Sequence, residues 1–389
     1  MRRVAIVITR FIAGAGGVAL RGALALDPQQ YSVTIFSAPG GPLLAEAEKA
    51  GFKIVRLDHM RPEISLREDP SALRELTALL REGDFDIVHT HSSKAGALGR
   101  IAAHRVGVPA IVHTFHGFPF HDFQFGPLRT TYIEIEKRLG RITDQFLAVG
   151  GAVAAQAISL RIAPAERIRA IASAIELNIA PASQSTRAAA RALMGLPENA
   201  LVVGTVGRLA PQKAPQDMVA AIAAMRRPNV LCVWVGDGPM RAEITRLIER
   251  RRLTNQFLLL GERNDVAALL PGFDVFALAS HYEGLPCSVV EAMTCGVPVV
   301  ATAVNAVPEV VVPGRTGLLV PAGAPDLLGR ALSYLLDHPG DGSRMALAAR
   351  TQLGDRFSPE VLGRDLVETY EMALTNSPRA VRKALRLVA

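Results

Sequence analysis

The sequence predicts an α/β protein built of two doubly wound domains with a cleft between them. Short runs rich in β-branched residues alternate with amphipathic stretches through the first half of the chain, and the alternation starts again near residue 201. Such alternation is typical of parallel sheets covered by helices on both faces. The length of 389 residues also suits two domains of ordinary size.

The first domain is predicted over residues 1–178. Helical patterns, such as Ser71–Arg81 and Lys94–Val106, separate its strand-like runs. The strands are expected at Val4–Thr9, Ser32–Phe36, Lys53–Arg56, Ile87–Thr90, Ala110–Thr114 and Gln145–Val149.

The second domain is predicted over residues 179–358, after a small and polar segment at 181–186. Its helical patterns include Met218–Met225 and Arg241–Arg251. Its strands are expected at Leu201–Val206, Val230–Val235, Phe257–Leu260, Asp274–Ala277 and Pro298–Ala301. Open α/β sheets bind ligands at the carboxyl ends of their strands, so we expect the loops there to hold the chemistry.

Composition excludes several classes of protein. Hydrophobic residues make up 49% and charged residues 20%, which rules out a disordered chain. The three cysteines cannot all pair, and none is spaced as C-x-x-C, so a reduced cytosolic protein without a thiolate metal site is expected. No apolar run reaches 18 residues, and the apolar start is expected to be a strand rather than a signal peptide.

The net charge of +7 favours an anionic partner such as a nucleotide or phospholipid. Aromatic residues are only 5%, and no basic run has aromatics interleaved, which argues against nucleic acid.

Glycines follow the first predicted strand, at Gly14, Gly16 and Gly17. Glycines there let a phosphate or sugar approach the backbone at the start of a helix. The pattern is not G-x-G-x-x-G, and no acidic residue ends the second strand, which argues against NAD. The alternative is a tight turn.

The fourth strand leads into His89, His91, Ser92 and Lys94. Two histidines two residues apart could bind a metal if the strand extends through both, but no third ligand is evident. A polar binding loop is the preferred interpretation. The alternative is a helix cap supplied by Ser92 or Ser93.

His116 and Gly117 follow the fifth strand. This position places the imidazole of His116 in the predicted cleft, with Gly117 permitting a sharp turn. The alternative is a structural histidine.

Two cations follow the first strand of the second domain. Gly207 and Arg208 follow the strand directly, and Lys213 stands at a predicted helix start. A guanidinium fork and an ammonium beside a helix terminus suit a diphosphate. The alternative is two solvated surface cations.

Glu283 and Glu291 flank a short loop and a helix start, with Pro286 expected in the first helical turn. Two carboxylates could be a glycosidase acid and nucleophile. Beside a diphosphate site they could instead bind the hydroxyls of a nucleotide sugar, with Glu283 at the mouth of the cleft. A charge pair at the start of the helix is the third interpretation.

These residues, in this order, resemble the retaining glycosyltransferases of family four, which have the GT-B fold of two Rossmann-like domains facing across a cleft. The resemblance covers nearly the whole chain, and its first half resembles the branch that builds bacterial capsule, exopolysaccharide or lipid-linked glycans. The segments that carry it are Asp86–Gly96, His113–Gly117, Gly207–Leu209 with Lys213, the E-x7-E pair with Glu291–Met293, Gly296–Thr302, Glu309–Val311 and Gly314–Val320.

The resemblance implies a donor site. Arg208 and Lys213 would hold the donor diphosphate and stabilise the leaving group. Glu291 would bind the ribose, and Glu283 the donor sugar. The remaining donor-side residues are Gly16, Gly17, Gly207, Arg263, Gly284, Leu285 and Pro286. No metal and no cofactor are expected.

The resemblance also implies that His116 lies beside the reacting sugar, with His91, Ser92 and Lys94 on the acceptor side. The C-terminal helix of this fold crosses back to the first domain, and Pro359–Ala373 within the expected segment 359–389 is the candidate. Two segments depart from the family pattern, Ser173–Glu176 at the domain junction and Gly150–Ala152 after the sixth strand. The cations and the E-x7-E pair are intact, so an active enzyme is expected.

The basic tail carries apolar residues at helical spacing among Arg379, Arg382, Lys383 and Arg386. It is expected either to lie on an anionic membrane surface or to be a solvated tail. The first of these would make the protein peripheral on the inner face of the plasma membrane.

The leading hypothesis is transfer of a sugar from a UDP-sugar to a glycan or polyprenyl-linked acceptor. A nucleotide-sugar 2-epimerase of the same fold is a second candidate, since fold alone does not fix function. A non-catalytic, membrane-docked partner of another transferase is the third.

Overall fold

The computed structural model describes residues 1–12, 14–118, 120, 126–173, 175 and 179–381. The chain divides into two compact units. Unit 1 comprises Met1–Ala174 and Phe357–Ala389, and unit 2 comprises Ile175–Arg356. The segment that follows Arg356 therefore belongs with the first half of the chain.

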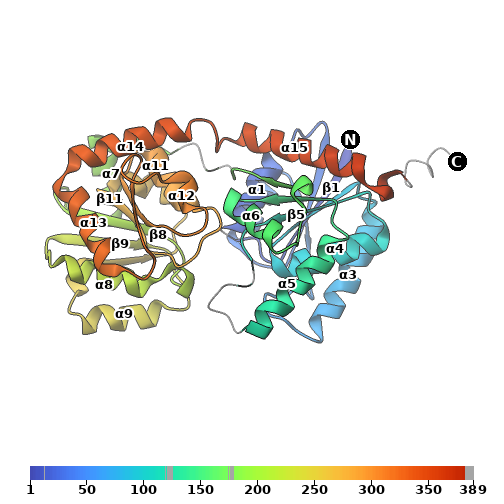
Figure 1. Ribbon diagram of the computed structural model, residues 1–389, viewed down its shortest axis with the longest axis horizontal. Helices are drawn as coiled ribbons and strands as arrows, with labels where there is room; N and C mark the ends of the chain where they lie inside the picture. Colours follow the sequence, from blue (N-terminus) through green and yellow to red (C-terminus); the bar gives the residue numbers. More distant parts are fainter. Residues whose placement is uncertain (13, 119, 121–125, 174, 176–178, 382–389) are drawn as a thin grey trace. The chain divides into compact units, whose positions relative to one another are not determined.

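Unit 1 contains a parallel sheet in the order β3-β2-β1-β4-β5-β6-β7. Two of its strands, β1 and β5, are labelled in Figure 1. Its central strands are rich in Val and Ile and are buried on both faces, as expected for parallel strands covered by helices. The strands are β1 (Arg2–Ile8), β2 (Tyr31–Ser37), β3 (Lys53–Arg56), β4 (Ile87–His91), β5 (Ala110–Phe115), β6 (Gln145–Ala148) and β7 (Ile168–Ala170).

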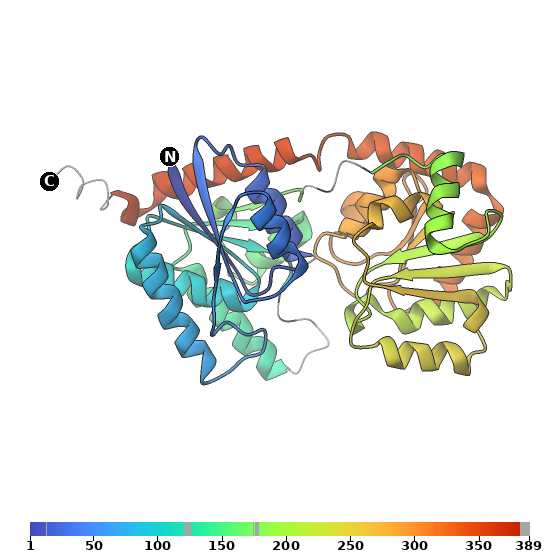
Figure 2. The ribbon, with the colours of Figure 1, turned by 180° about the vertical axis from the view of Figure 1, so that it is seen from behind.

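Alternate residues of β1 enter different cores. Ile6 packs with helices α1, α2 and α15, whereas Val7 packs with α3 and α4 on the opposite face. Figure 2 shows helices on both faces of this sheet. Helix α15 thus completes the unit 1 core although it comes from the end of the chain. The helices are α1 (Ala15–Leu24), α2 (Pro42–Lys49), α3 (Glu68–Gly83), α4 (Ser93–Val106), α5 (Gly126–Gly140), α6 (Gly151–Ser159) and α15 (Pro359–Asn376).

Unit 2 contains a second parallel sheet, in the order β10-β9-β8-β11-β12-β13. Its strands are β8 (Leu201–Val206), β9 (Val230–Val235), β10 (Phe257–Gly261), β11 (Val275–Leu278), β12 (Val299–Thr302) and β13 (Leu318–Val320). Its helices are α7 (Gln184–Met194), α8 (Pro215–Met225), α9 (Arg241–Arg250), α10 (Val266–Leu269), α11 (Cys287–Cys295), α12 (Val307–Val310), α13 (Pro325–Asp337) and α14 (Pro339–Leu353).

The fold matches the predicted class of two Rossmann-like α/β domains. Strands β7 and β13 were not predicted. Each has only three residues and lies at the edge of its sheet, so it carries too little alternation to be recognised. Within the departure expected at 173–176, residues 174 and 176 lie outside the described residues.

Candidate functional site

Most of the predicted site residues follow the strands at which the order of each sheet reverses, whereas His116 follows β5 and Arg263 follows β10. In unit 2 the reversal lies between β8 and β11, and in unit 1 it lies between β1 and β4. At such a switch point neighbouring loops diverge and leave room for a ligand at the carboxyl edge. Gly207, Arg208 and Lys213 follow β8, whereas Gly16 and Gly17 follow β1.

The backbone that carries Arg208 is held closely against the next loop. Gly207 donates its N–H to the carbonyl of Val235 at 2.9 Å, and Leu209 donates to that of Asp237 at 3.0 Å. A Cβ added at Gly236 would lie 2.3 Å from the carbonyl oxygen of Gly207, and φ at Gly236 is +131°. Only glycine allows this approach, so the position of the loop depends on it.

Lys213 and Glu283 form the central ion pair of this region. The Lys213 ammonium lies 2.6 Å from Oε1 of Glu283, and Ser280 donates to the same oxygen at 2.5 Å. The side chain of Glu283 is only 4% exposed. Oε2 accepts no hydrogen bond from the described residues and stays available to a ligand hydroxyl. Glu283 was expected at the mouth of a cleft, but its side chain is buried, and Lys213 and Ser280 satisfy the carboxylate there.

The aliphatic part of Lys213 lies along Gly207, where an added Cβ would be 3.2 Å from Cε. Lys213 ends a 3-10 turn, Pro211–Lys213, and α8 begins two residues later at Pro215. Lys213 therefore precedes the helix rather than starting it.

Arg208 is exposed. Its guanidinium forms no hydrogen bond or ion pair with the other residues that the structure describes. An exposed, uncompensated guanidinium beside a paired ammonium can accept an anion without first losing a protein partner.

The stretch from Glu283 to Glu291 turns from a loop into a helix. Pro286 is the N-cap residue of α11 rather than part of its first turn, so Gly284 and Leu285 form the loop before it. Asn305, which follows β12, accepts the backbone N–H of Glu283 at 3.0 Å. Glu291 lies half-buried within α11. The loop that precedes α11 is therefore fixed at Glu283 through both its backbone and its side chain.

Arg263 follows β10 and pairs with a nearby carboxylate. Its Nε and Nη2 donate to the two oxygens of Asp265 at 2.8 and 2.6 Å. The hydrogen bond from Arg263 lowers the pKa of Asp265. The guanidinium of Arg263 is thus held by Asp265, and the place of Arg263 in the donor site stays a prediction.

The glycines after β1 are explained by local packing. Gly14 is the N-cap of α1 with φ +76°. A Cβ at Gly16 would lie 3.2 Å from the carbonyl carbon of Phe11, and one at Gly17 would lie 3.0 Å from the Arg21 guanidinium. This agrees with the tight-turn interpretation. The approach of Gly16 and Gly17 to a ligand stays a prediction.

Ser92 is the N-cap residue of α4, but its side chain does not cap the helix. Its hydroxyl lies 2.8 Å from that of Thr9, which follows β1, and Thr9 accepts the backbone N–H of Ala95 at 3.1 Å. Ser92 has φ +60°. The two strand ends at the switch point are therefore joined by side chains.

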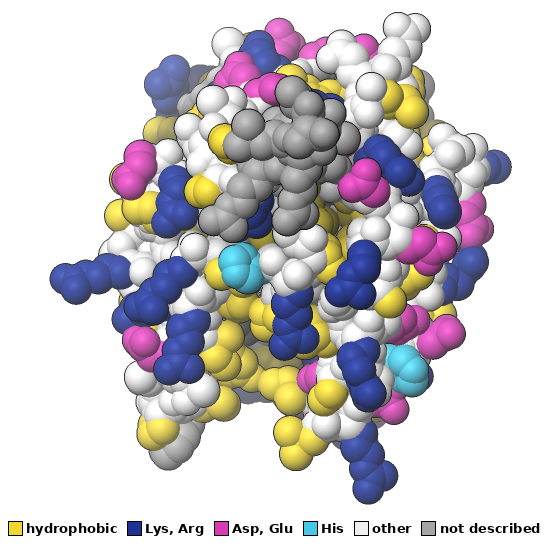
Figure 3. Space-filling view, turned by 90° about the vertical axis from the view of Figure 1, so that its right-hand side faces the viewer, with side chains coloured by type: hydrophobic (Ala, Val, Ile, Leu, Met, Phe, Trp, Pro, Cys, Tyr) yellow, Lys and Arg dark blue, Asp and Glu magenta, His cyan; other side chains and the backbone are white. Residues whose placement is uncertain are grey.

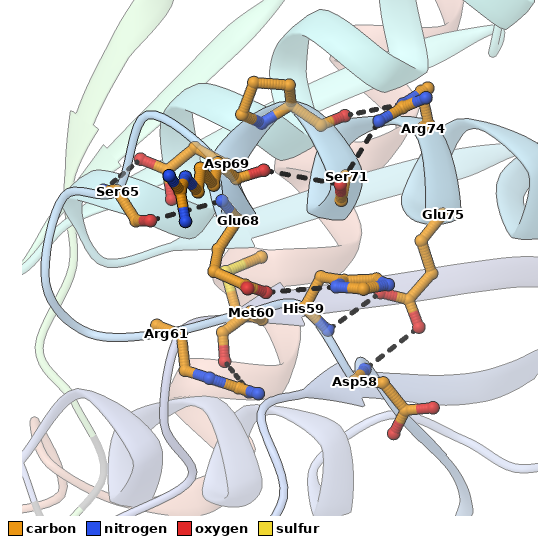
Figure 4. A network of polar contacts seen from close by, with 12 residues as sticks. Asp58, His59, Met60, Arg61, Ser65, Glu68, Asp69, Ser71, Arg74 and Glu75 are labelled. Carbon is orange, nitrogen blue, oxygen red and sulfur yellow. Dashed lines mark hydrogen bonds and ion pairs between the residues drawn. The ribbon is translucent and has the colours of Figure 1, made fainter.

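Lys94 is part of a polar network at the carboxyl end of β3. Its ammonium lies 2.5 Å from Oδ1 of Asp69 and also bonds the carbonyl of Glu63. Figure 4 shows the network around the segment that leads into α3, in which the carboxylate of Glu75 accepts the backbone N–H groups of Asp58 and His59. The side chain of Lys94 is 11% exposed. Lys94 thus anchors this segment, and its contact with an acceptor stays a prediction.

Four histidines gather at the ends of β4 and β5. Because β4 extends to His91, the rings of His89 and His91 share one face, with centroids 4.3 Å apart. His91 is 3% exposed, and its Nδ1 lies 2.9 Å from Nε2 of His116. Burial lowers the pKa of His89 to about 3 and that of His116 to about 4, so both rings are neutral at pH 7. Within the described parts of the chain, no group of three or more His, Cys, Asp or Glu is arranged to hold a metal ion.

The basic tail is described only as far as residue 381. Arg379 was expected either to lie against lipid or to be solvated, but its side chain is largely buried against unit 1. It donates to the carbonyl of Val108 at 3.0 Å and pairs with Asp144. Figure 3 looks onto unit 1 and shows Lys and Arg spread over this face, with Asp and Glu among them. No described helix is long and apolar enough to cross a membrane.

Sequence reasoning missed three residues that organise the site. Ser280 orients Glu283, Asn305 bonds its backbone, and Tyr370 bonds His89. Ser280 and Asn305 each follow a buried strand, which is a signal that could have been used. Tyr370 contacts a residue 281 positions away, and nothing in its neighbourhood in the sequence points to that contact.

Family models match both units. The model described as glycosyl transferases group 1 matches residues 187–352, and the glycosyltransferase family 4 model matches residues 12–179. The UDP-Gal:alpha-D-GlcNAc-diphosphoundecaprenol alpha-1,3-galactosyltransferase of Escherichia coli is 31% identical over 302 residues, which cover 76% of this chain and 77% of the relative. The D-inositol 3-phosphate glycosyltransferase of Salinispora arenicola is 30% identical over 75% of this chain and 70% of the relative. The chain therefore belongs to the glycosyltransferases that combine a family 4 first domain with a group 1 second domain.

Solved structures share the fold. The Anabaena protein HepE in complex with UDP-glucose superposes with a TM-score of 0.83 at 22% identity, over 95% of this chain and 100% of that one. WaaG, a glycosyltransferase involved in lipopolysaccharide biosynthesis, gives a TM-score of 0.76 at 16% identity, over 95% and 99%. These likenesses, together with the two family models, identify the fold of this chain as GT-B.

Proposed function

We propose that this glycosyltransferase moves a sugar from a UDP-sugar to a glycan or polyprenyl-diphosphate-linked acceptor, with retention of anomeric configuration and without a bound metal. The observation that carries the proposal is that two cations follow the same strand, one without a protein partner in the described part of the chain and one already paired with a carboxylate. Arg208 is exposed and uncompensated, whereas Lys213 is held by buried Glu283 at 2.6 Å. Both follow β8 at the switch point, where a ligand diphosphate would lie.

The electrostatics suit a diphosphate leaving group. Negative charge grows on the departing phosphate oxygens as the bond to the sugar breaks, and preorganised cations stabilise that charge without reorganising. Arg208 would supply a two-pronged contact and Lys213 a point charge. Glu291 would then take the ribose hydroxyls, and the loop at Gly284 and Leu285 the sugar.

The Glu283 carboxylate is a poor candidate for a nucleophile. Its Oε1 already accepts hydrogen bonds from Lys213 and Ser280, so this oxygen is engaged within the protein and not directed at the sugar. Oε2 is free to accept a sugar hydroxyl. We therefore propose front-face transfer, in which the bond from C1 to the diphosphate breaks and the acceptor oxygen bonds C1 on the same face. The proton of the acceptor hydroxyl passes to the departing phosphate.

The choice of substrates rests on the relatives. The Escherichia coli relative is named for UDP-Gal and an acceptor linked to diphosphoundecaprenol, and HepE has been solved with UDP-glucose. We carry the UDP-sugar and the lipid-linked acceptor to this chain as the best-supported classes. Such an acceptor would place the reaction at the cytoplasmic face of a membrane.

The test is an assay of the full chain in EDTA with a panel of UDP-sugars and a short-chain polyprenyl-diphosphate GlcNAc acceptor. The proposal expects a glycosylated product whose anomeric coupling matches that of the donor. Arg208→Ala should lower turnover about 10²-fold. Arg246→Ala, which removes an exposed cation from α9, should leave turnover unchanged.

Two outcomes would replace the proposal. A new UDP-sugar formed without acceptor would support the epimerase of the same fold. The absence of any product, with or without EDTA, would favour a non-catalytic partner of another transferase.

A further inference from the structure

The side chain of His91 lies inside unit 1, in contact with His116. Strands β4 and β5 pair in parallel with His91 opposite Thr114, so the residue that ends β4 comes beside the loop that follows β5. The contact is a hydrogen bond of 2.9 Å between Nδ1 of His91 and Nε2 of His116. His91 is buried and His116 is half-buried.

This hydrogen bond makes the two rings depend on each other. Burial holds the pKa of both imidazoles well below 7, so each ring carries a single N–H. In a hydrogen bond between two neutral imidazoles, one nitrogen must donate and the other must accept. The location of the proton on His91 therefore decides the location of the proton on His116.

The second nitrogen of His91 shows which arrangement is favoured. Nε2 is buried and has no hydrogen-bond partner among the described residues. The nearby ring of His89 cannot serve, because its Nδ1 bonds the hydroxyl of Tyr370 at 2.8 Å and its Nε2 that of Thr114 at 2.7 Å. The cavity beside these rings is lined mostly by apolar residues of β1, α1 and α15.

A buried N–H without a partner is rarer in proteins than an acceptor without one. The proton of His91 therefore belongs on Nδ1, where it is shared with His116, and not on Nε2.

We infer that His91 is a positioning residue, which donates from Nδ1 to Nε2 of His116 and so keeps the single proton of His116 on Nδ1. His116 then presents a neutral N–H that points away from His91. Such a group donates a hydrogen bond to a hydroxyl oxygen of the reacting sugar and does not act as a general base through Nε2. The inference rests on the proposed function, since it gives His116 its role toward the sugar. It also replaces direct acceptor contact as the role of His91.

The first test needs no substrate. Long-range proton–nitrogen NMR spectra of the full chain, labelled in the histidine rings, report which nitrogen of each ring is protonated at pH 7.5. His116→Gln and His91→Phe assign the two rings by loss of signal. The inference expects a single His116 tautomer with the proton on Nδ1. A proton on Nε2 of His116 in the wild-type protein would overturn it.

Variants separate positioning from simple packing. His91→Phe keeps the volume but removes the donor, so His116 should move toward the Nε2–H tautomer that histidine prefers in water. His91→Asn keeps an amide N–H near the place of Nδ1 and should restore the Nδ1–H tautomer. Tyr370→Phe breaks the bond to His89 only, and the His116 signal should not change. An unchanged His116 signal in folded His91→Phe would also overturn the inference.

The same variants are then assayed for transfer. His91→Phe should lower turnover about tenfold, the worth of one neutral hydrogen bond, while the dissociation constant of UDP stays unchanged. Because the spectra are recorded without ligand, they decide the tautomer even if the proposed transfer reaction is wrong.

Discussion

The ammonium of Lys213 lies 2.6 Å from the carboxylate of Glu283, across 70 residues of sequence. This pair joins the loop after β8 to the loop after β11, the two strands that flank the switch point of unit 2. Lys213 is thus neutralised and oriented before any nucleotide arrives. A diphosphate would meet an ammonium whose position is already fixed.

Lys213→Ala should reduce turnover by about 10²–10³-fold, because one preorganised charge toward the leaving group is lost. It should also lower the free energy of unfolding by about 3 kcal/mol, because the buried carboxylate of Glu283 loses its charge partner. Steady-state assays and urea unfolding measure the two effects. Turnover within a few-fold of wild type would contradict the role of Lys213.

The double variant Lys213→Met, Glu283→Gln separates these effects. It leaves no buried charge unpaired, so most of the lost stability should return. Turnover should stay low, because the ammonium is still absent. Recovery of both stability and turnover in the double variant would mean that Lys213→Ala lowers turnover only by destabilising the folded protein.

Nucleotide binding should be selective and should persist in EDTA. In a thermal-shift panel of UDP, GDP, ADP and dTDP, we expect UDP to raise the unfolding midpoint by several degrees. At about 100 times its dissociation constant a ligand adds about 2.7 kcal/mol of stability. Glu291→Ala should lose most of the shift, because the ribose contact is removed. A shift that EDTA abolishes would contradict a metal-independent donor site.

Gly236→Ala should weaken UDP binding, even though Gly236 has no side chain that could contact the nucleotide. Gly236 lies in the loop that follows β9. Its φ of +131° disfavours alanine, and the new Cβ would lie 2.3 Å from the carbonyl oxygen of Gly207. The loop that carries Arg208 must then shift. Gly340→Ala is the matched control, because a Cβ there meets no atom within 4 Å. Titration calorimetry with UDP should show weaker binding for the first variant and unchanged binding for the second.

The free energy of unfolding should decrease as the pH is lowered from about 6.5 to 5. Burial lowers the pKa of His89 to about 3 in the folded protein, whereas an unfolded histidine titrates near 6.5. Below 6.5 the unfolded chain therefore binds a proton that the folded chain does not, and each such histidine costs about 1.4 kcal/mol per pH unit. Urea midpoints at pH 7.5, 6 and 5 measure the slope.

His89→Gln should make this pH dependence shallower, because one buried titrating ring is removed. His104→Gln, which changes an exposed histidine on α4, should keep the wild-type slope. Equal slopes in all three proteins would mean that the buried rings do not govern acid stability.

Much of the fold could be predicted from the sequence, because buried parallel strands are continuous apolar runs with polar loops between them. The strands Lys53–Arg56, Leu201–Val206 and Val230–Val235 were predicted with the bounds observed. The three-residue edge strands β7 and β13 could not be predicted, because three residues are too few to show the alternation of apolar and polar residues that marks a strand. The family was predicted from sequence motifs, and the family models confirm it.

The residues of the candidate site could be predicted from the sequence, but the contacts between them could not. The position of Lys213 near Glu283 follows from strand order, which local patterns do not contain. The bond between His91 and His116 depends on the register of β4 and β5, and one residue of slip would separate the rings. The inward turn of Arg379 depends on Asp144, which lies 235 residues earlier.

The contact between His89 and Tyr370 has a consequence for biosynthesis. A ribosome that has just added His89 must add 281 more residues before the hydroxyl that bonds it exists. At about 5–20 residues per second, this takes roughly 15–60 s. Until then the sheet face that α15 covers is exposed on the nascent chain, whereas the segment Ile175–Arg356 has already been made in full. Unit 2 can therefore complete its core before unit 1, because the core of unit 1 depends on α15, which is made after all of unit 2.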